Sequence, residues 1–195
     1  MGKFIDALRR PAAIPVYILI LLGILIGGAS AVGFNQALEA TNTQEFCTSC
    51  HIMAEGPFVM LQDTTHFKNE SGMTPACSDC HVPKEFIPKM WRKIQAAREV
   101  WSTVTGKIDT REKYLEHVPA MKAREIARMR ANDSQECRNC HEVERMLLAE
   151  QSVKARQFHQ AMMQQGGTCI DCHQGLAHMS PAIAERLEQA LSESH

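Results

Sequence analysis

Cys47-Thr48-Ser49-Cys50-His51 decides how this chain folds, because the same C-x-x-C-H pattern occurs three more times, beginning at Cys77, Cys137 and Cys169. Two thiols at this spacing can form thioethers with the two vinyl groups of one porphyrin. The adjacent imidazole then lies where the iron can bind it. The pattern is the attachment signature of a c-type haem, so four copies predict four covalently bound haems.

These copies use every cysteine of the chain, which leaves none for a disulfide. With 8 cysteines and 9 histidines in 195 residues, about 0.015 copies of the pattern are expected by chance. Zinc is the competing interpretation, but a histidine directly after each second cysteine is not zinc-finger spacing. The predicted attachment residues are Cys47, Cys50, Cys77, Cys80, Cys137, Cys140, Cys169 and Cys172, and the motif histidines are His51, His81, His141 and His173.

Charge and length limit the kind of partner and the number of domains that the chain can have. Residues 1–34 carry a net +2, and the rest of the chain, with 18 basic and 21 acidic residues, carries −3. A nucleic-acid-binding domain needs a basic face, so no nucleic acid partner is expected. Residues 35–195 are enough for one domain at most. We expect the porphyrins to supply most of its core.

Residues 14–34 contain no charged side chain. As a helix they would extend about 31 Å, which spans a bilayer core. Basic residues precede this segment, so the positive-inside rule predicts a cytoplasmic N-terminus, a single-pass anchor within residues 1–34 and a periplasmic domain over residues 35–195. The alternative is a cleaved signal peptide with Ala29-Ser30-Ala31 as cleavage site. Gly23 and Gly27 form a G-x-x-x-G pattern, which would allow a homodimer through the membrane helix.

The haem-bearing part divides into two similar di-haem units, about residues 45–105 and 135–180. In each unit a histidine, His66 or His159, stands shortly before the second motif. The second motifs both carry an aspartate before their second cysteine. We interpret this similarity as an old internal duplication.

Helical periodicity predicts a mainly α fold with much irregular backbone and no strand. Residues 87–104 form the clearest amphipathic pattern, ended by Gly106. This helix could lie on the membrane surface, pack its apolar face on a haem, or do both. Further helices are expected at 111–119, 120–131, 142–165 and 181–191, with a break or kink at Pro119.

Five histidines lie outside the motifs: His66, His117, His159, His178 and His195. A second axial imidazole is the usual ligand of an electron-transfer haem. His66, His159 and His178 are each close to a motif in sequence, which favours them as such ligands. His117 is distant from every motif, and His195 ends the chain.

The chain resembles the NapC/NirT family in four features. They are a membrane helix ahead of four C-x-x-C-H motifs, C-x-x-C-H-x-M in the first motif, H-V-P-K-E-F after the second and A-N-D-S-x-E before the third. Members of this family are membrane-anchored tetrahaem quinol dehydrogenases, and this chain is most similar to the branch that serves periplasmic nitrate reductase. The resemblance covers almost the whole chain up to His178.

The resemblance implies a ligand set that differs from simple counting. Met53 would bind the first haem iron, with Glu99 covering the open face, although relatives often carry aspartate there. His51 remains the alternative ligand of that haem. The other pairs implied by the resemblance are His81 with His159, His141 with His178, and His173 with His66.

The function implied is oxidation of membrane quinol, either menaquinol or ubiquinol. Lys93 would hydrogen-bond a quinol oxygen and Glu99 would accept a proton. Electrons would pass through the haems to a periplasmic reductase or its cytochrome subunit. An alternative is a relay subunit, permanently bound to a reductase such as nitrite reductase, without its own quinol site. A third is a terminal multihaem reductase, although the chain has no C-x-x-C-K motif.

Overall fold

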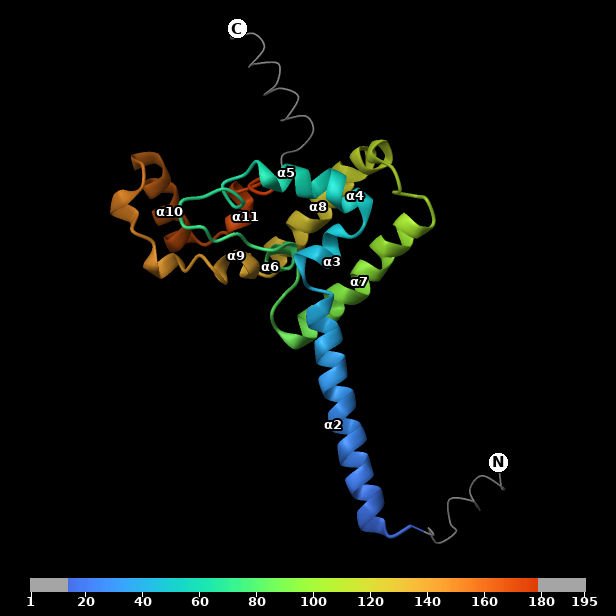
Figure 1. Cartoon of the computed structure of the whole chain (residues 1–195). Helices are drawn as coiled ribbons and strands as arrows, with labels where there is room; N and C mark the ends of the chain where they lie inside the picture. The colour runs from blue at the N-terminus through green and yellow to red at the C-terminus, as the bar shows by residue number, and fades with distance from the viewer. Residues whose placement is uncertain (1–13, 179–195) are drawn as a thin grey trace. The chain divides into compact units, whose positions relative to one another are not determined.

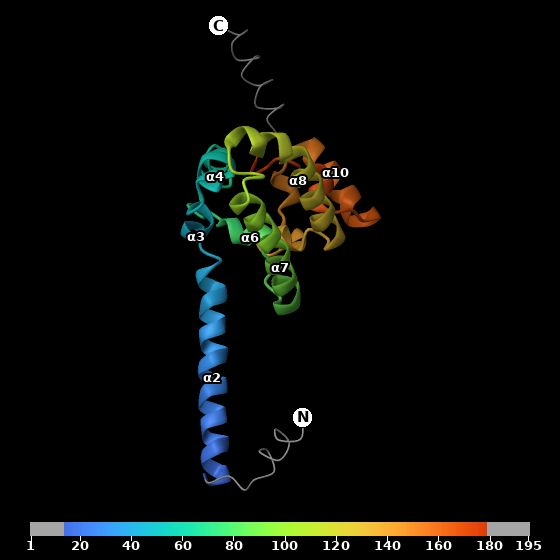
Figure 2. The same cartoon turned by 90° about the vertical axis from the view of Figure 1, so that its right-hand side faces the viewer.

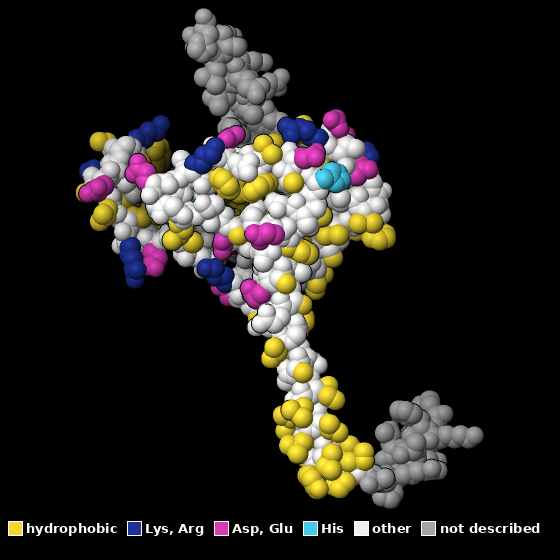
Figure 3. Space-filling view, in the orientation of Figure 1, with side chains coloured by type: hydrophobic (Ala, Val, Ile, Leu, Met, Phe, Trp, Pro, Cys, Tyr) yellow, Lys and Arg dark blue, Asp and Glu magenta, His cyan; other side chains and the backbone are white. Residues whose placement is uncertain are grey.

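The computed structural model describes residues 14–178, and the chain divides into two compact units, Met1–Thr41 and Asn42–His195. The described part of the first unit is built on one helix, α2 (Val16–Ala40), which follows Pro15. It is long and apolar enough to cross a membrane, with a mean hydropathy of 2.3 in its most apolar window. Apolar side chains point outward along it (Figure 3). The predicted apolar helix is confirmed, and it continues six residues beyond Phe34.

The second unit is helical and irregular, with no strand among the residues that the structure describes. Short helices carry the four motifs, and three longer ones connect them. Its α-helices are α3 (Gln44–Thr48), α4 (His51–Met53), α5 (Val59–Gln62), α6 (Cys77–His81), α7 (Phe86–Val104), α8 (Arg111–Ala131), α9 (Gln135–Arg138), α10 (Val153–Gln165) and α11 (Cys169–Cys172). A π-helical turn (Ala54–Phe58) joins α4 to α5, and two 3₁₀ turns (Val143–Arg145 and Leu148–Glu150) precede α10.

Helix α8 lies between the two ends of this unit. Both views place α4 near one end and α10 at the other (Figure 1 and Figure 2). The polypeptide itself makes only a small apolar core here. In the described part of the second unit the buried apolar side chains are Ile52, Leu61, Met129 and Val143. So few buried side chains agree with a domain whose interior is shared with large cofactors.

Two predicted helix boundaries are wrong. Residues 111–131 form the single helix α8, which runs through Pro119 instead of stopping there. The proline lacks one backbone N–H, but Thr110 caps the helix start by accepting the Lys113 N–H, and side chains near residue 128 secure the far end. Two fixed ends tolerate one missing hydrogen bond.

The helix predicted at 142–165 is wrong in its first half, which forms two short 3₁₀ turns, and only Val153–Gln165 forms the α-helix α10. Ser152 begins α10 by accepting the Ala155 N–H, and Arg156 holds the carbonyls of Leu148 and Ala149 in the preceding turn. The predicted ends of α7 and α10 are confirmed, because Gly106 and Gly166 follow them with φ of +75° and +81°. The helix predicted at 181–191 lies outside the described residues, as does His195.

Candidate haem-binding sites

The second and fourth motifs begin in the same way. Asp79 accepts the backbone N–H of Ala76 at 2.8 Å, and Asp171 accepts that of Thr168 at 2.9 Å. In both, an aspartate in the first helical turn satisfies a backbone donor that the helix leaves unpaired. The aspartates singled out from the sequence therefore have the same local role.

The first and third motifs begin differently. Thr43 caps α3 by accepting the Phe46 N–H at 3.1 Å. The third motif follows a turn in which Asp133 and Ser134 have φ of +56° and +52°. Ser134 is fully buried, and its hydroxyl accepts the backbone N–H of Ile170, inside the fourth motif, at 3.2 Å. This turn therefore ties the third and fourth motifs together.

The four motifs succeed one another in space in their chain order. The Cys47 and Cys77 thiols hydrogen-bond to each other, which raises the pKa of Cys47 and lowers that of Cys77. Burial and then the nearby Cys137 raise the pKa of Cys80 to about 11. Cys137 in turn lies close enough to Cys169 for their charges to interact. Cofactors attached to these thiols would form one continuous series.

Six histidines face one another in three pairs. The ring centres of His81 and His178 are 6.0 Å apart, those of His66 and His141 are 6.2 Å apart, and those of His159 and His173 are 5.9 Å apart. Two imidazoles bound to one metal from opposite sides, through bonds of about 2 Å, have ring centres roughly 6 Å apart. Each pair thus fits an iron between its rings, and each contains one motif histidine.

The His178 ring is in the protonation state that iron requires. Burial, followed by the nearby His81, lowers the pKa of His178 to about 4. This imidazole is therefore neutral at pH 7, and neutral imidazole is the form that binds metals. The residues present fit bis-imidazole haems at the second, third and fourth motifs.

These ring contacts differ from the ligand pairs that the family resemblance implied, which join His81 to His159, His141 to His178 and His173 to His66. His159 lies on α10, and the glycine turn after Gln165 brings the fourth motif back beside it. His66 lies in the segment after α5, which runs toward the α10 end of the unit (Figure 1). Its ring lies edge-on to that of His141. Distance along the chain does not reveal these paths.

His51 has a different environment from the other motif histidines. Its Nε2 lies 2.8 Å from the backbone oxygen of Asp109. A carbonyl can only accept, so this nitrogen carries the proton and donates it. A protonated, donating nitrogen has no lone pair for iron. Met53, two residues further along, has a side chain that is 36% exposed.

His117 bonds within its own helix. Its Nδ1 lies 2.8 Å from the backbone oxygen of Lys113, one turn earlier in α8. Its ring is in none of the three imidazole pairs.

Lys93 and Glu99 both lie on α7. The Lys93 charge acts on the Cys47 thiol, which places it near the first motif. Glu99 has a half-exposed carboxylate, 3.3 Å from the guanidinium of Arg92. The six-residue spacing turns Lys93 and Glu99 to different sides of the helix.

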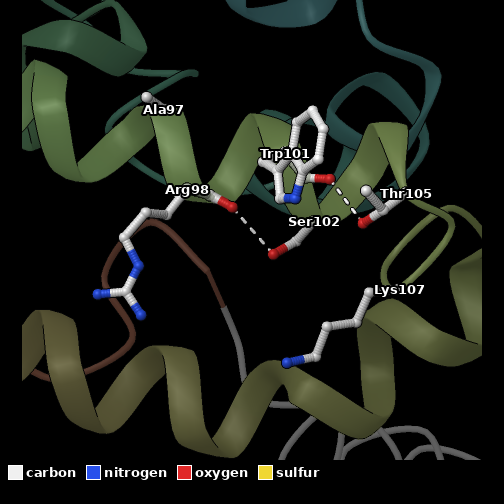
Figure 4. A pocket seen from close by; sticks show the side chains of 6 residues that line it. All are labelled: Ala97, Arg98, Trp101, Ser102, Thr105 and Lys107. Atoms are coloured by element: carbon white, nitrogen blue, oxygen red, sulfur yellow. Dashed lines mark hydrogen bonds between the residues drawn. The ribbon is translucent and has the colours of Figure 1, made fainter.

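Helix α7 turns its apolar side outward. Its exposed apolar side chains, between 58% and 73% accessible, include both tryptophans of the chain; they are Phe86, Ile87, Trp91, Ile94, Val100, Trp101 and Val104. The residues between them that are more covered include Arg92 and Lys93. An open groove of about 520 Å³ follows the C-terminal half of the helix, with Trp101, Arg98 and Lys107 on its walls (Figure 4).

The comparison with protein families identifies the chain. Residues 10–183 match the model of the NapC/NirT cytochrome c family, N-terminal region. The chain belongs to this family.

Three relatives extend this result over almost the whole chain. A cytochrome c-type protein NapC from Haemophilus influenzae is 46% identical over 184 residues, covering 94% of this chain and 91% of the relative. NapC from Paracoccus pantotrophus is 46% identical, covering 91% of this chain and 76% of the relative. The denitrification system component NirT from Stutzerimonas stutzeri is 42% identical, covering 92% and 90%. Among solved structures, a cytochrome c nitrite reductase NrfHA complex matches with a TM-score of 0.47 and 24% identity, from which we draw no conclusion.

Membership of the NapC/NirT family confirms the predicted fold class and the c-type attachment. This family member is a mainly helical, tetrahaem c-type cytochrome with an apolar N-terminal helix suited to a single-pass anchor. The eight cysteines and the three imidazole pairs agree with that cofactor content. The ligand of each iron and the quinol residues stay predictions.

A charged network behind His81 was not predicted from the sequence. Glu125 on α8 lies 2.8 Å from the His81 Nδ1 and also accepts from Arg128. Arg128 donates to Glu136, directly before the third motif, and to the Cys80 carbonyl. Burial alone would raise the pKa of Glu125, but the bonds from His81 and Arg128 outweigh it and hold that pKa far below its usual range. The spacing of Glu125 and Arg128 indicates a helix-surface pair, and nothing in it points to His81.

Proposed function

We propose that this chain oxidises membrane quinol and delivers the electrons to a periplasmic reductase. The observation that carries this proposal is the contrast between the first motif and the others: His51 donates to Asp109 and, in the described part of the chain, faces no second imidazole. Such a motif favours a haem with an accessible side, which is what a hydrophobic reductant needs. The four haems would supply the one-electron carriers, and the chain supplies their positions and ligands.

The ring separations support a ligand set for three of the irons. We assign the second motif's iron to His81 and His178, the third to His141 and His66, and the fourth to His173 and His159. The assignment rests on ring separations that fit two axial imidazoles. We assign Met53 to the first iron, as the resemblance implied, because the His51 Nε2 donates to the Asp109 carbonyl instead.

Lys93 and Glu99 are the residues that we propose to act on the quinol. Lys93 would donate a hydrogen bond to a quinol oxygen, and its proximity to Cys47 supports a place beside the first motif. Glu99 would accept one of the two protons that quinol releases on oxidation. Arg92 would keep the Glu99 carboxylate in position.

The membrane side of the proposal rests on α2 and α7. Helix α2 would anchor the chain in the cytoplasmic membrane, with the N-terminus in the cytoplasm and the haem domain in the periplasm. The exposed apolar face of α7, with Trp91 and Trp101, is suited to the interface of the bilayer. Quinol could then reach the first motif without crossing water.

Periplasmic nitrate reductase is the acceptor that we favour. Two relatives at 46% identity are named NapC, and one at 42% is the denitrification component NirT. The alternative acceptor is a nitrite reductase to which the chain would be permanently bound as a relay. The test is whether the quinol-reduced chain is reoxidised rapidly by nitrate reductase, by nitrite reductase, or by both.

The quinol site can be tested with the full chain in lipid nanodiscs, by following haem reduction after mixing with menaquinol or ubiquinol. We expect Glu99→Gln and Lys93→Gln each to slow reduction by at least about tenfold, since removal of a general base or a positioning donor typically costs that much or more. Glu144→Gln and Lys154→Gln, at exposed positions away from α7, are the matched controls. Wild-type rates in both α7 variants would remove these two residues from the site.

A spectroscopic measurement separates quinol oxidation from a pure relay. If the first haem is the site, the electron paramagnetic resonance spectrum contains one high-spin haem that a quinol-site inhibitor perturbs. An entirely low-spin spectrum without response to the inhibitor supports the relay.

A further inference from the structure

The carboxylate of Glu125 is placed behind a motif histidine, at a position that metal sites use to adjust the metal. Its Oε1 lies 2.8 Å from the Nδ1 of His81. A carboxylate of this kind accepts, so His81 must donate from Nδ1, which leaves its Nε2 unprotonated and directed to the iron. A carboxylate behind a metal-bound histidine fixes the tautomer, orients the ring and makes it a more basic ligand.

The other histidines of the three pairs have no charged partner of this type among the described residues. The nearest counterpart is His159, whose Nδ1 lies 2.7 Å from the neutral amide oxygen of Gln151. The Nδ1 of His66 is buried without a hydrogen-bond partner. Within the described residues, His81 therefore differs from the other paired histidines in having a carboxylate behind its ring.

Hydrogen bonds from Arg128 fix the orientation of the Glu125 carboxylate and stabilise its negative charge. Arg128 donates to both Glu125 oxygens, at 3.2 and 3.1 Å from Nε and 2.7 Å from Nη2. The Nη1 of Arg128 donates to Glu136, whose side chain is 1% exposed. Glu136 also accepts hydrogen bonds from Asn132. Glu125 and Arg128 cancel in charge beside His81, and Glu136, directly before the third motif, gives the whole network a net charge of −1.

We propose that Glu125 is a positioning residue that makes the haem at the second motif the lowest in reduction potential of the three haems with paired imidazoles. The carboxylate of Glu125 makes His81 a more basic ligand, which stabilises the ferric state and lowers the potential. The inference rests on the proposed function, because it requires His81 to be an iron ligand. Arg128 also binds the Cys80 carbonyl, so the same network fixes the backbone of the second motif.

A reciprocal pair of substitutions tests this proposal. Glu125→Gln gives His81 a neutral amide partner, as His159 has now, and Gln151→Glu gives His159 a carboxylate, as His81 has now. The holoprotein is titrated by spectroelectrochemistry, and the electron paramagnetic resonance spectrum records the ligand field of each low-spin haem. We expect Glu125→Gln to move one midpoint potential upward and Gln151→Glu to move a different one downward, while all three low-spin signals persist.

The outcomes separate failure of this inference from failure of the ligand assignment. If Glu125→Gln and Gln151→Glu leave every midpoint potential unchanged while His81→Ala removes one low-spin signal, His81 is a ligand and the role of Glu125 is wrong. If His81→Ala leaves all low-spin signals in place, the assignment of His81 itself is wrong. Should Glu125→Gln weaken folding, Gln151→Glu still tests the rule, because Gln151 is a half-buried residue before α10 that lies outside the Arg128 network.

Discussion

The first and second motifs have the same five-residue pattern and different surroundings. At the first, His51 donates through Nε2 to the carbonyl of Asp109, 58 positions away in the sequence. At the second, His81 donates through Nδ1 to Glu125, 44 positions away, and faces His178 across a gap that fits an iron. The pattern fixes where a haem is attached, and distant residues decide which nitrogen, if any, meets the metal.

The largest effect that we expect concerns the imidazole opposite the second motif. His178→Ala removes one axial ligand, so one of the three low-spin bis-imidazole signals should be lost and a high-spin signal gained in the ferric protein. His117→Ala is the control, because that ring bonds to the Lys113 carbonyl of its own helix and is in none of the three imidazole pairs among the described residues. Electron paramagnetic resonance with spin counting measures both. Three intact low-spin signals in His178→Ala would contradict the pairing seen in the structure.

A smaller change is expected at the first motif. Met53→Leu keeps the volume of the side chain and removes its sulfur, so the first haem loses its proposed ligand. We expect the spectrum of that haem alone to change and quinol oxidation to slow by at least about tenfold, the lower end of the loss when a metal site loses a supporting group.

Met73→Leu is the matched control, since Met73 is 70% exposed in the loop before the second motif. If Met53→Leu behaves like this control in both spectrum and rate, the first haem uses another ligand. The contrast between the two motifs would then be one of hydrogen bonding only.

The haem attachment sites and most helices could be predicted from the sequence, whereas the histidine pairs depend on how the chain folds back on itself. Attachment sites, the apolar helix and the limits of α7 follow from short patterns in which each residue acts on near neighbours. The histidine pairs do not, because His66 meets the third motif although it precedes the second. Asp109 and Glu125 are likewise invisible in the pattern, because each acts on a histidine more than 40 positions away.

Helix α8 shows the same limit for secondary structure. Pro119 in a helix interior costs about 3 kcal/mol, and from the sequence this favours a break. The structure keeps one helix, because its start is capped by Thr110 and its far half carries Glu125 and Arg128 to the second motif. A local cap at one end and tertiary contacts at the other outweigh the local preference in the middle.

The network behind the second motif should also contribute to stability. Glu136→Gln replaces a buried carboxylate that Arg128 and Asn132 both bind. We expect a loss of about 1–3 kcal/mol, the usual effect of weakening a buried charged hydrogen bond. For a chain of this size that corresponds to a melting temperature lower by several degrees, at about 2–4 °C per kcal/mol. Glu142→Gln, which breaks only the exposed pair with Arg145, should leave the melting temperature within a degree or so of wild type.

The smallest effects on stability are expected from substitutions of the residues that begin the helices of the first and second motifs. Thr43→Ala removes the cap of α3, and Asp79→Ala removes the acceptor of the Ala76 N–H at α6. Each should cost about 1 kcal/mol in thermal unfolding of the holoprotein, as for other helix caps. Because neither side chain touches His51 or His81 in the contacts described, we expect the haem spectra and potentials to stay unchanged. A change in potential from Asp79→Ala as large as that from Glu125→Gln would mean that any carboxylate near the second motif lowers the potential. The specific bond to His81 would then not be what distinguishes this motif from the first.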